Sequence, residues 1–437
     1  MNYRLTEKKS GNAVLHIPEG VRDLYQEDCQ KKLSMQEHIH EIFNLYGFKD
    51  IQTPTFEFFD VFNKEKGSVL SREMYKFFDR DGNTLVLRPD MTPSIARCIG
   101  KYYKDVVMPI RLCYMGNTYI NYTSYRGKLK ETTQLGVELY NDATVDADAE
   151  ILALTVECLL STGLNDFQVE IGHADFFLGL MEEADFDEEE SQQLRILMES
   201  KNIFGVEEML DGKKLPSDLK ELLKKLPDLF GTKETLSFAK ERTKNARALK
   251  SIERLMKLHD ILAAYGLEKY ITFDLGMLSQ YRYYTGIVFK AYTYGNGEPV
   301  VTGGRYDTLL SQFDKEAPAI GMVILLDQLL LTLSRQQKEE APKKEQLQLL
   351  YVGDVRRQAI ELANAFRKSG QSLELVRKAS RFSLEEYIEY AKTEGVTSIF
   401  FMENEAEALV VDVLKGQKET KKISVLLEEA TRIGGSK

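Results

Sequence analysis

The spacing of apolar residues predicts that much of the chain mixes helices with hairpin-forming strands. Apolar positions recur at helical intervals across residues 27–45, and Gly47 follows where such a helix would end. Residues 80–83, Arg-Asp-Gly-Asn, separate two short apolar segments and are a strong signal for a β-hairpin. Further strands are expected at 48–53, 75–79, 84–88, 109–119, 132–140 and 167–171, and further helices at 93–103 and 147–162. Such a succession is typical of an antiparallel sheet with helices packed alongside it.

The composition changes in the middle of the chain. Residues 176–266 are poor in strand signals and rich in Glu, Lys and Leu, so we expect a helical insertion there. Strands return at 271–274 and 286–294, and the apolar run 320–333 is interpreted as a buried helix. Residues 1–335 are therefore expected to form an α+β core with an antiparallel sheet and one helical insertion.

A polar segment at 336–347 has the composition of a linker. In residues 348–437, expected strands alternate with expected helices, which indicates a small α/β domain with a largely parallel sheet. The strands are expected at 349–352, 372–376 and 398–402, and the helices at 356–368 and 383–392.

Composition and charge narrow the class of protein. The chain has 437 residues with a net charge of −10, which argues against a main task of holding nucleic acid. No apolar stretch has the length of a membrane helix or a signal peptide, so we expect a cytoplasmic protein. Thiols far apart in the sequence fit a reducing compartment, and with five histidines they suggest neither a metal site nor a disulfide framework. The cysteines are Cys29, Cys98, Cys113 and Cys158.

The sequence contains no motif for independent chemistry or for a cofactor. It has no P-loop, no G-x-G-x-x-G, no H-E-x-x-H and no nucleophile elbow. Five short stretches stand out instead. These are 18–23 (Pro-Glu-Gly-Val-Arg-Asp), 87–93 (Leu-Arg-Pro-Asp-Met-Thr-Pro), 134–138 (Gln-Leu-Gly-Val-Glu), 283–286 (Tyr-Tyr-Thr-Gly) and 303–307 (Gly-Gly-Arg-Tyr-Asp).

In this order and with about this spacing, the five stretches resemble the successive motifs of the histidyl-tRNA synthetase family. The resemblance spans most of residues 18–330. Residues 349–402 resemble, less specifically, that family's C-terminal anticodon-binding domain. The resemblance implies a class II synthetase-like antiparallel sheet and a dimer formed through the helix and strand of residues 27–54.

The resemblance also implies which residues would hold histidine. An α-ammonium needs acceptors, which Asp90, Thr92 and Gln134 can supply. An imidazole needs an acceptor for one N–H and a flat apolar wall, which Glu138 and a tyrosine can supply. Asp90 replaces the glutamate usual in the synthetase, so its reach is shorter. The matching positions are Asp90, Thr92, Gln134, Glu138, Tyr283 and Tyr284.

These six residues, and the stretch 303–305, also have structural interpretations that need no ligand. The alternatives are a helix cap for Thr92, a turn for Asp90, a solvated strand face for Gln134 and Glu138, core packing for Tyr283 and Tyr284, and a tight turn with a structural arginine for 303–305.

The positions that would bind ATP differ from the synthetase pattern. Activation of an amino acid brings a carboxylate against a phosphate, so the site needs fixed cations. Where the family has three arginines, this chain has Ile120, Ser279 and Gln328. Arg282 occupies a position that is acidic in the family, and Tyr122 replaces another acid. Losing one such donor typically costs a factor of ~10²–10³ in rate, so we expect little activation.

A synthetase-like core with Asp-Met-Thr-Pro at 90–93 and replaced ATP arginines resembles the ATP phosphoribosyltransferase regulatory subunit family of histidine biosynthesis. This resemblance implies a non-catalytic subunit that a short-form catalytic ATP phosphoribosyltransferase, a glycosyltransferase, needs for activity and for feedback inhibition by histidine. It implies a homodimer within a hetero-oligomer, without tRNA or membrane as partner. The alternatives are a histidyl-tRNA synthetase with divergent motifs and a stand-alone amino-acid-binding module.

Overall fold

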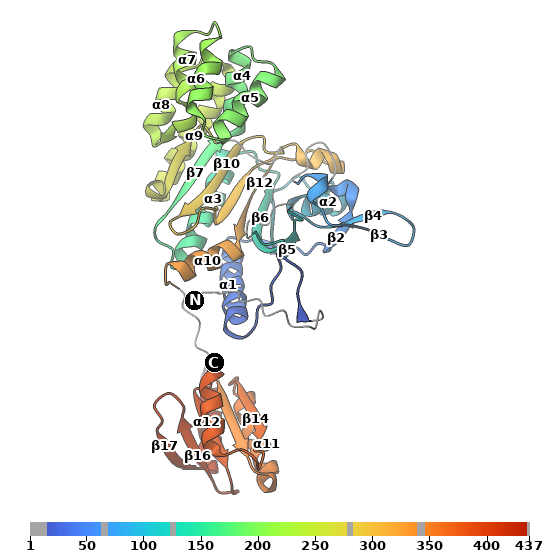
Figure 1. Ribbon diagram of the computed structural model, residues 1–437, viewed down its shortest axis with the longest axis vertical. Helices are drawn as coiled ribbons and strands as arrows, with labels where there is room; N and C mark the ends of the chain where they lie inside the picture. Colours follow the sequence, from blue (N-terminus) through green and yellow to red (C-terminus); the bar gives the residue numbers. More distant parts are fainter. Residues whose placement is uncertain (1–14, 63–68, 123–127, 278–282, 339–345, 435–437) are drawn as a thin grey trace. The chain divides into compact units, whose positions relative to one another are not determined.

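The chain divides into two compact units, Met1–Ala341 and Pro342–Lys437, which are described separately. The computed structural model in Figure 1 describes residues 15–62, 69–122, 128–277, 283–338 and 346–434. Within these ranges, no helix is both long and apolar enough to cross a membrane.

The first unit is built on a nine-stranded sheet with the order β1-β5-β6-β12-β11-β10-β7-β9-β8. β1 pairs with β5 and β7 pairs with β9 in parallel, and the other neighbours are antiparallel. The expected α+β class with an antiparallel sheet is therefore confirmed. The strands are β1 Lys49–Asp50, β5 Ile110–Tyr119, β6 Glu131–Tyr140, β7 Phe167–His173, β8 Phe230–Gly231, β9 Ile271–Asp274, β10 Ile287–Thr293, β11 Val301–Arg305 and β12 Ala319–Leu325.

The two faces of β6 pack against different helices. Leu135, Val137 and Leu139 are fully buried in a core that also takes apolar residues from helices α1, α3 and α10. The alternate residues, from Gln134 to Tyr140, leave the strand on the opposite face, where helix α2 packs. These helices are α1 Gln26–Leu45, α2 Thr92–Tyr102, α3 Val145–Ser161 and α10 Leu326–Arg335.

Six α-helices form most of the region between β7 and β9, with β8 between α7 and α8, and they gather at one end of the large sheet (Figure 1). Their apolar residues continue the core of the sheet, since Leu194, Leu222 and Leu255 belong to the same buried cluster as β6. The helices are α4 Ala174–Glu183, α5 Glu188–Glu199, α6 Ile203–Asp211, α7 Ser217–Lys225, α8 Lys233–Arg242 and α9 Ala246–Ala264.

The hairpin expected around residues 80–83 is confirmed. β3 (Lys76–Phe78) and β4 (Thr84–Leu87) pair in antiparallel fashion, and β2 (Phe56–Phe58) completes a three-stranded sheet. The Asp79 carboxylate accepts from the Asp81 and Asn83 backbone amides at 3.0 and 2.8 Å. Gly82 has a φ of +84°, which favours glycine at this point of the turn.

One expectation and one alternative interpretation for the C-terminal part of this unit are wrong. Residues 320–333 are not one helix, because the run holds most of β12 and then most of α10. β12 is a central strand, so both of its faces are buried, and a continuous apolar run looks the same for such a strand and for a buried helix. Residues 303–305 do not form a tight turn, because they belong to β11.

The second unit has a mixed five-stranded sheet with the order β14-β13-β15-β16-β17. β14, β13 and β15 are parallel, as expected, whereas β16 and β17 are antiparallel additions that the sequence pattern did not predict. β17 reads Lys-Glu-Thr-Lys-Lys and is exposed, so it lacks an apolar signal. The elements are β13 Leu347–Tyr351, β14 Leu373–Arg377, β15 Ser398–Met402, β16 Glu407–Asp412, β17 Lys418–Lys422, α11 Arg356–Lys368, α12 Leu384–Thr393 and α13 Ile423–Gly434.

Candidate functional site

A cavity of about 660 Å³ opens on the face of the large sheet that carries α2. Strands β6, β10, β11 and β12 contribute to its lining, together with the segment before α2. The structure brings all six predicted ligand-binding residues to this lining from three distant parts of the sequence. They are Asp90, Thr92, Gln134, Glu138, Tyr283 and Tyr284, and we call the space the Glu138 cavity.

Glycines on the central strands make room for this cavity. Gly321 of β12 pairs with Glu138 of β6, and a Cβ atom at Gly321 would lie 1.8 Å from Glu138 Oε2. A Cβ at Gly303 would lie 2.3 Å from the Phe289 ring, and one at Gly304 would lie 2.7 Å from the Tyr284 ring. The glycines of 303–304 thus allow close packing within a strand, where a turn was one sequence interpretation.

Glu138 is the centre of the polar cluster in the cavity, and only 2% of its surface is exposed. Its Oε1 accepts from the Thr92 hydroxyl at 2.8 Å, and its Oε2 accepts from the Tyr306 hydroxyl. Burial raises the pKa of the Glu138 carboxyl to about 8, and the negative charge of Asp90 adds to the rise. The two hydroxyl donors oppose that rise. Glu138 is therefore a solvent-shielded acceptor whose described donors are uncharged.

Asp90 and Thr92 are held at the start of α2. The Thr92 backbone amide donates to Asp90 Oδ1 at 3.3 Å, and the Tyr283 hydroxyl donates to Asp90 Oδ2 at 3.4 Å. The Thr92 side chain reaches across to β6 and bonds Glu138. Thr92 is the first residue of α2 and does not cap it, because the N-cap residue is Met91, whose side chain makes no cap bond. The Thr92 hydroxyl ties the helix start to the sheet.

Gln134 lies on the same face of β6 as Glu138 and lines the cavity. Its Oε1 is buried and has no hydrogen-bond partner in the part of the chain that the structure describes. An unmatched buried acceptor costs about 1–3 kcal/mol, so a ligand that donates a hydrogen here gains that amount. Neither Gln134 nor Glu138 belongs to a solvated strand face.

Tyr306 is a residue of the cluster that sequence reasoning missed. Its hydroxyl donates to Glu138, and its ring packs edge-to-face on Tyr283 with centroids 5.7 Å apart. Tyr283 in turn lies 4.8 Å from the ring of Tyr284. Tyr306 belongs to the 303–307 stretch, so the sequence marks its neighbourhood but not its bond to Glu138.

Arg305, in the same 303–307 stretch, lies outside the Glu138 cavity and is 2% exposed. Its guanidinium donates to Asp148 of α3, with Nη2 2.6 Å from Oδ1, and Arg254 of α9 reaches the other oxygen of Asp148 at 2.5 Å. Arg305 is thus the structural arginine that one sequence interpretation proposed.

Uncharged residues occupy the described positions at which the synthetase family has ATP-binding arginines. Ile120 and Gln328 both line the cavity, and Gln328 Oε1 accepts from Asn296 at 3.0 Å. Ser279 and Arg282 lie outside the described residues. The described cations of the lining are Arg22, Lys128 and Lys290, of which Arg22 is paired with Asp327 at 2.7 Å and Lys128 with Glu298 at 3.3 Å.

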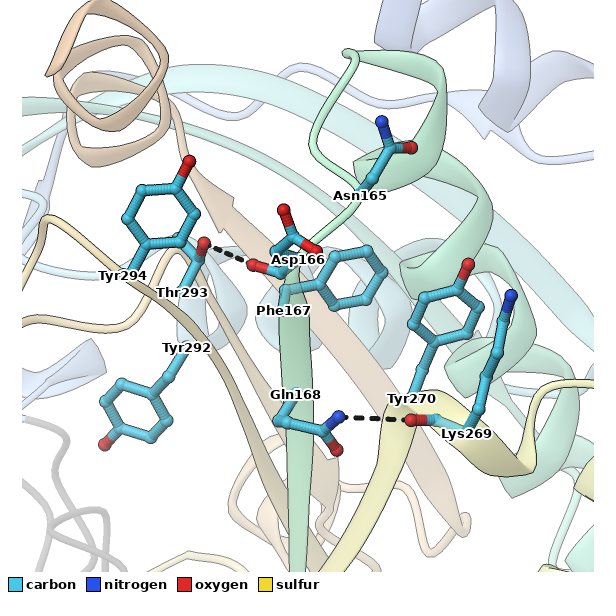
Figure 2. Close-up of a pocket in the computed structure, with 9 residues that line it drawn as sticks. All are labelled: Asn165, Asp166, Phe167, Gln168, Lys269, Tyr270, Tyr292, Thr293 and Tyr294. Carbon is cyan, nitrogen blue, oxygen red and sulfur yellow. Dashed lines mark hydrogen bonds between the residues drawn. The ribbon is translucent and has the colours of Figure 1, made fainter. Parts of the chain in front are cut away.

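A second recess, of about 590 Å³, lies where β7 and β10 meet the segment before β9 (Figure 2). Two hydrogen bonds join residues of its lining: Gln168 donates to the Lys269 carbonyl at 3.1 Å, and the Thr293 hydroxyl donates to the Asp166 carbonyl at 2.6 Å. Phe167 stacks on Tyr270 with centroids 4.9 Å apart. The recess lacks a cluster comparable to that around Glu138, so we take the Glu138 cavity as the candidate site.

The chain is similar to proteins of two related kinds. A family model described as histidyl-tRNA synthetase matches residues 20–329. An ATP phosphoribosyltransferase regulatory subunit of Acetivibrio thermocellus is 36% identical over 95% of this chain and 99% of its own length. One of Clostridium kluyveri is 38% identical over 87% of this chain and 97% of its own length.

Solved structures agree with these relatives in fold. One from Bacillus halodurans, described as an ATP phosphoribosyltransferase regulatory subunit/histidyl-tRNA synthetase, has a TM-score of 0.80 and 32% identity. It covers 89% of this chain and 98% of that one. A histidyl-tRNA synthetase from Nostoc sp. PCC 7120 is 17% identical, with a TM-score of 0.79 over 96% of this chain and 99% of its own, and shares the class II fold.

Proposed function

Because this chain belongs to the ATP phosphoribosyltransferase regulatory subunit family, we propose that it is a non-catalytic subunit that senses histidine in the Glu138 cavity. Its partner in this proposal is a catalytic ATP phosphoribosyltransferase, which needs this chain for activity and which histidine inhibits through it. The relatives are named for a regulatory role toward that enzyme, and this supports the partner.

One observation carries the choice of ligand: the cavity is lined by hydrogen-bond acceptors. The described donors to the Glu138 carboxyl group are two uncharged hydroxyls. Histidine presents an α-ammonium and a ring N–H, which are donors. Gln134 Oε1 and Asp90 can accept from the ammonium, and Glu138 can accept from the ring nitrogen. The Tyr284 ring can supply a flat wall for the imidazole.

The same cavity argues against amino-acid activation. A transition state that joins a carboxylate to the α-phosphate needs cations at the reacting atoms. Ile120 cannot supply one, and Gln328 is uncharged and bonded to Asn296. A sensor needs only the amino-acid half of the site, which is the half that retains its polar groups.

We also propose that the chain forms a homodimer through α1 and β1 within the hetero-oligomer. Leu33 and Leu45 of α1 are 60% and 80% exposed, and exposed apolar side chains on one helix support its use as a contact surface.

Reconstitution with the catalytic subunit of the same organism tests the function. We expect the purified chain to co-purify with that subunit and to raise its turnover, and we expect histidine to lower the turnover of the complex. A Glu138→Ala variant should keep the stimulation and lose the response to histidine. Failure of the wild-type chain to bind and stimulate the catalytic subunit contradicts the proposal.

Histidine-dependent ATP–pyrophosphate exchange separates this proposal from a synthetase with divergent motifs. We expect no exchange above background, whereas calorimetry should detect histidine binding to the chain alone. Robust exchange would favour the synthetase, and histidine binding without any complex would favour a stand-alone binding module.

A further inference from the structure

We propose that His40, Asp50 and Cys113 form a binding site for a divalent cation of the zinc type. One ligand atom from each residue lies within 4.8 Å of the other two. The three residues come from α1, β1 and β5 and are widely separated in sequence, so no metal-binding motif marks them. The proposal is independent of histidine binding and concerns the opposite face of the sheet from Glu138.

The fold sets the three side chains side by side. β1 runs parallel to β5, with Asp50 paired directly to Cys113, so both side chains leave the sheet on the same side. α1 leads into β1 through Gly47, which has a φ of +76° and turns the chain back toward the helix. His40, ten residues before Asp50, thereby faces the paired strands.

Hydrogen bonds to Asp50 now join the three residues. Asp50 Oδ1 lies 2.7 Å from His40 Nε2 and 3.6 Å from Cys113 Sγ. Zinc bonds of ~2.3 Å to sulfur and ~2.0 Å to oxygen and nitrogen, in tetrahedral geometry, place sulfur and oxygen ~3.5 Å apart and nitrogen and oxygen ~3.3 Å apart. The sulfur–oxygen pair has this separation, and the nitrogen–oxygen pair needs a shift of about half an ångström. The Asp50 side chain is 69% exposed and can make that shift.

The donor set decides the class of ion. Imidazole, thiolate and carboxylate together suit Zn²⁺, whereas Mg²⁺ and Ca²⁺ prefer oxygen ligands alone. The cation would replace the hydrogens that now lie between Asp50 Oδ1 and its two neighbours, and the thiol proton would pass to solvent. The three residues supply three of the four ligands of a tetrahedral ion.

A neighbour on α1 can orient the histidine. Asn44 lies one helical turn after His40, and its Nδ2 is 3.5 Å from His40 Nδ1. With a metal on Nε2, Nδ1 carries the ring hydrogen and the Asn44 amide can turn its oxygen to accept it. Such support of the second ring nitrogen is usual for metal-bound histidine. The bound ion would fix the two-residue strand β1 and the end of α1 to β5.

Cobalt titration of the full-length chain tests the site. After removal of metals with a chelator, we expect one equivalent of Co²⁺ to produce a near-ultraviolet thiolate-to-cobalt charge-transfer band, which Zn²⁺ then abolishes by competition. Cys113→Ser should remove the band. His40→Gln and Asp50→Asn should weaken Co²⁺ affinity by at least the ~10-fold that loss of supporting groups alone can cost.

Matched controls come from the same helix. His38→Gln and Cys29→Ser change a histidine and a cysteine of α1 outside the triad and should leave the band and the affinity unchanged. Circular dichroism of each metal-free variant checks that it is folded, and Asp50→Asn, at an exposed position, tests the site without disturbing the core. The absence of a band at saturating Co²⁺, or a band that persists in Cys113→Ser, overturns the proposal.

Discussion

Two buried carboxyl groups, Glu138 on β6 and Asp148 on α3, have different kinds of partner. Both are at most 2% exposed. Asp148 faces two arginines, with Arg305 bonded to one of its oxygens and Arg254 to the other. Glu138 is approached by the hydroxyls of Thr92 and Tyr306 and borders an open cavity.

The difference separates a structural group from a binding group. Two guanidinium groups match the charge and both oxygens of Asp148, and the cluster joins α3, α9 and β11. Hydroxyls match the geometry of Glu138 but not a charge, so burial keeps its pKa near 8. The remaining capacity of Glu138 to accept a hydrogen is what a ligand in the cavity can use.

Asp148→Asn should have the largest effect, because it leaves Arg305 and Arg254 without their buried counter-charge. Breaking one partner of a buried ion pair costs roughly 3–5 kcal/mol of unfolding free energy. Urea denaturation followed by circular dichroism measures this, since the chain contains no tryptophan. Glu253→Gln, next to Arg254 but in an exposed ion pair, is the control and should change stability by less than ~1 kcal/mol. Equal losses in both variants would contradict the structural role of the Asp148 cluster.

Gly321→Ala, which alters the Glu138 cavity, should have the next largest effect on stability. The new methyl group would collide with Glu138 Oε2, and overpacking of this kind costs about 1–3 kcal/mol. Displacement of Glu138 should also weaken histidine binding by at least about tenfold, or ~1.4 kcal/mol, in calorimetry. Gly297→Ala also adds a methyl group at the cavity lining but meets nothing within 4 Å, so its affinity should match the wild type. Unchanged affinity in Gly321→Ala would mean that histidine binds elsewhere.

Glu138→Gln should change how stability depends on pH. In the unfolded chain the glutamate loses its proton near pH 4.5, whereas in the folded chain it keeps the proton up to about pH 8. The wild type should therefore lose unfolding free energy, relative to the variant, as pH rises from about 4.5 to about 8. Denaturation at several pH values in this window measures the divergence. Parallel curves for the two proteins would indicate that Glu138 is not a high-pKa group.

His173 should give the smallest effect, and with the opposite sign. Burial lowers its pKa from 6.5 to about 4, so the folded chain keeps a neutral ring where the unfolded chain takes up a proton. Unfolding free energy should fall as pH drops from 6.5 toward 4, and His173→Asn should reduce this fall. Asparagine can replace the acceptor that His173 Nδ1 offers to the Asp175 amide at the start of α4. The same acid sensitivity in the variant would assign the loss to other groups.

Local sequence patterns predicted most elements of the fold. The mispredicted elements depend on where a strand lies in the folded sheet. The hairpin around Gly82, the helix over 27–45 and the strand pair β5–β6 have signals within a few residues. β12 was read as a helix because a strand buried on both faces has no alternation. β17 was missed because its residues are polar and exposed.

In the candidate site, too, some features have local sequence signals and others depend on the tertiary structure. The family resemblance of short stretches pointed to Asp90 and Glu138, and the structure places both on one cavity. Sequence could not reveal that Tyr306 shares Glu138 with Thr92, nor that Arg305 turns to Asp148, because both depend on which strands become neighbours. The triad of His40, Asp50 and Cys113 is hidden from sequence for the same reason.

The position of β12 has a consequence for synthesis in the cell. β12 lies between β6 and β11, yet it leaves the ribosome nearly 180 residues after β6. At ~5–20 residues per second, the nascent chain exposes an unmatched edge of β6 for roughly 10–40 s. An open edge of this kind can pair with another chain, so we expect the nascent chain to be prone to aggregation in this interval. A fragment that ends before residue 319 keeps that edge permanently and lacks the Gly321 floor of the cavity.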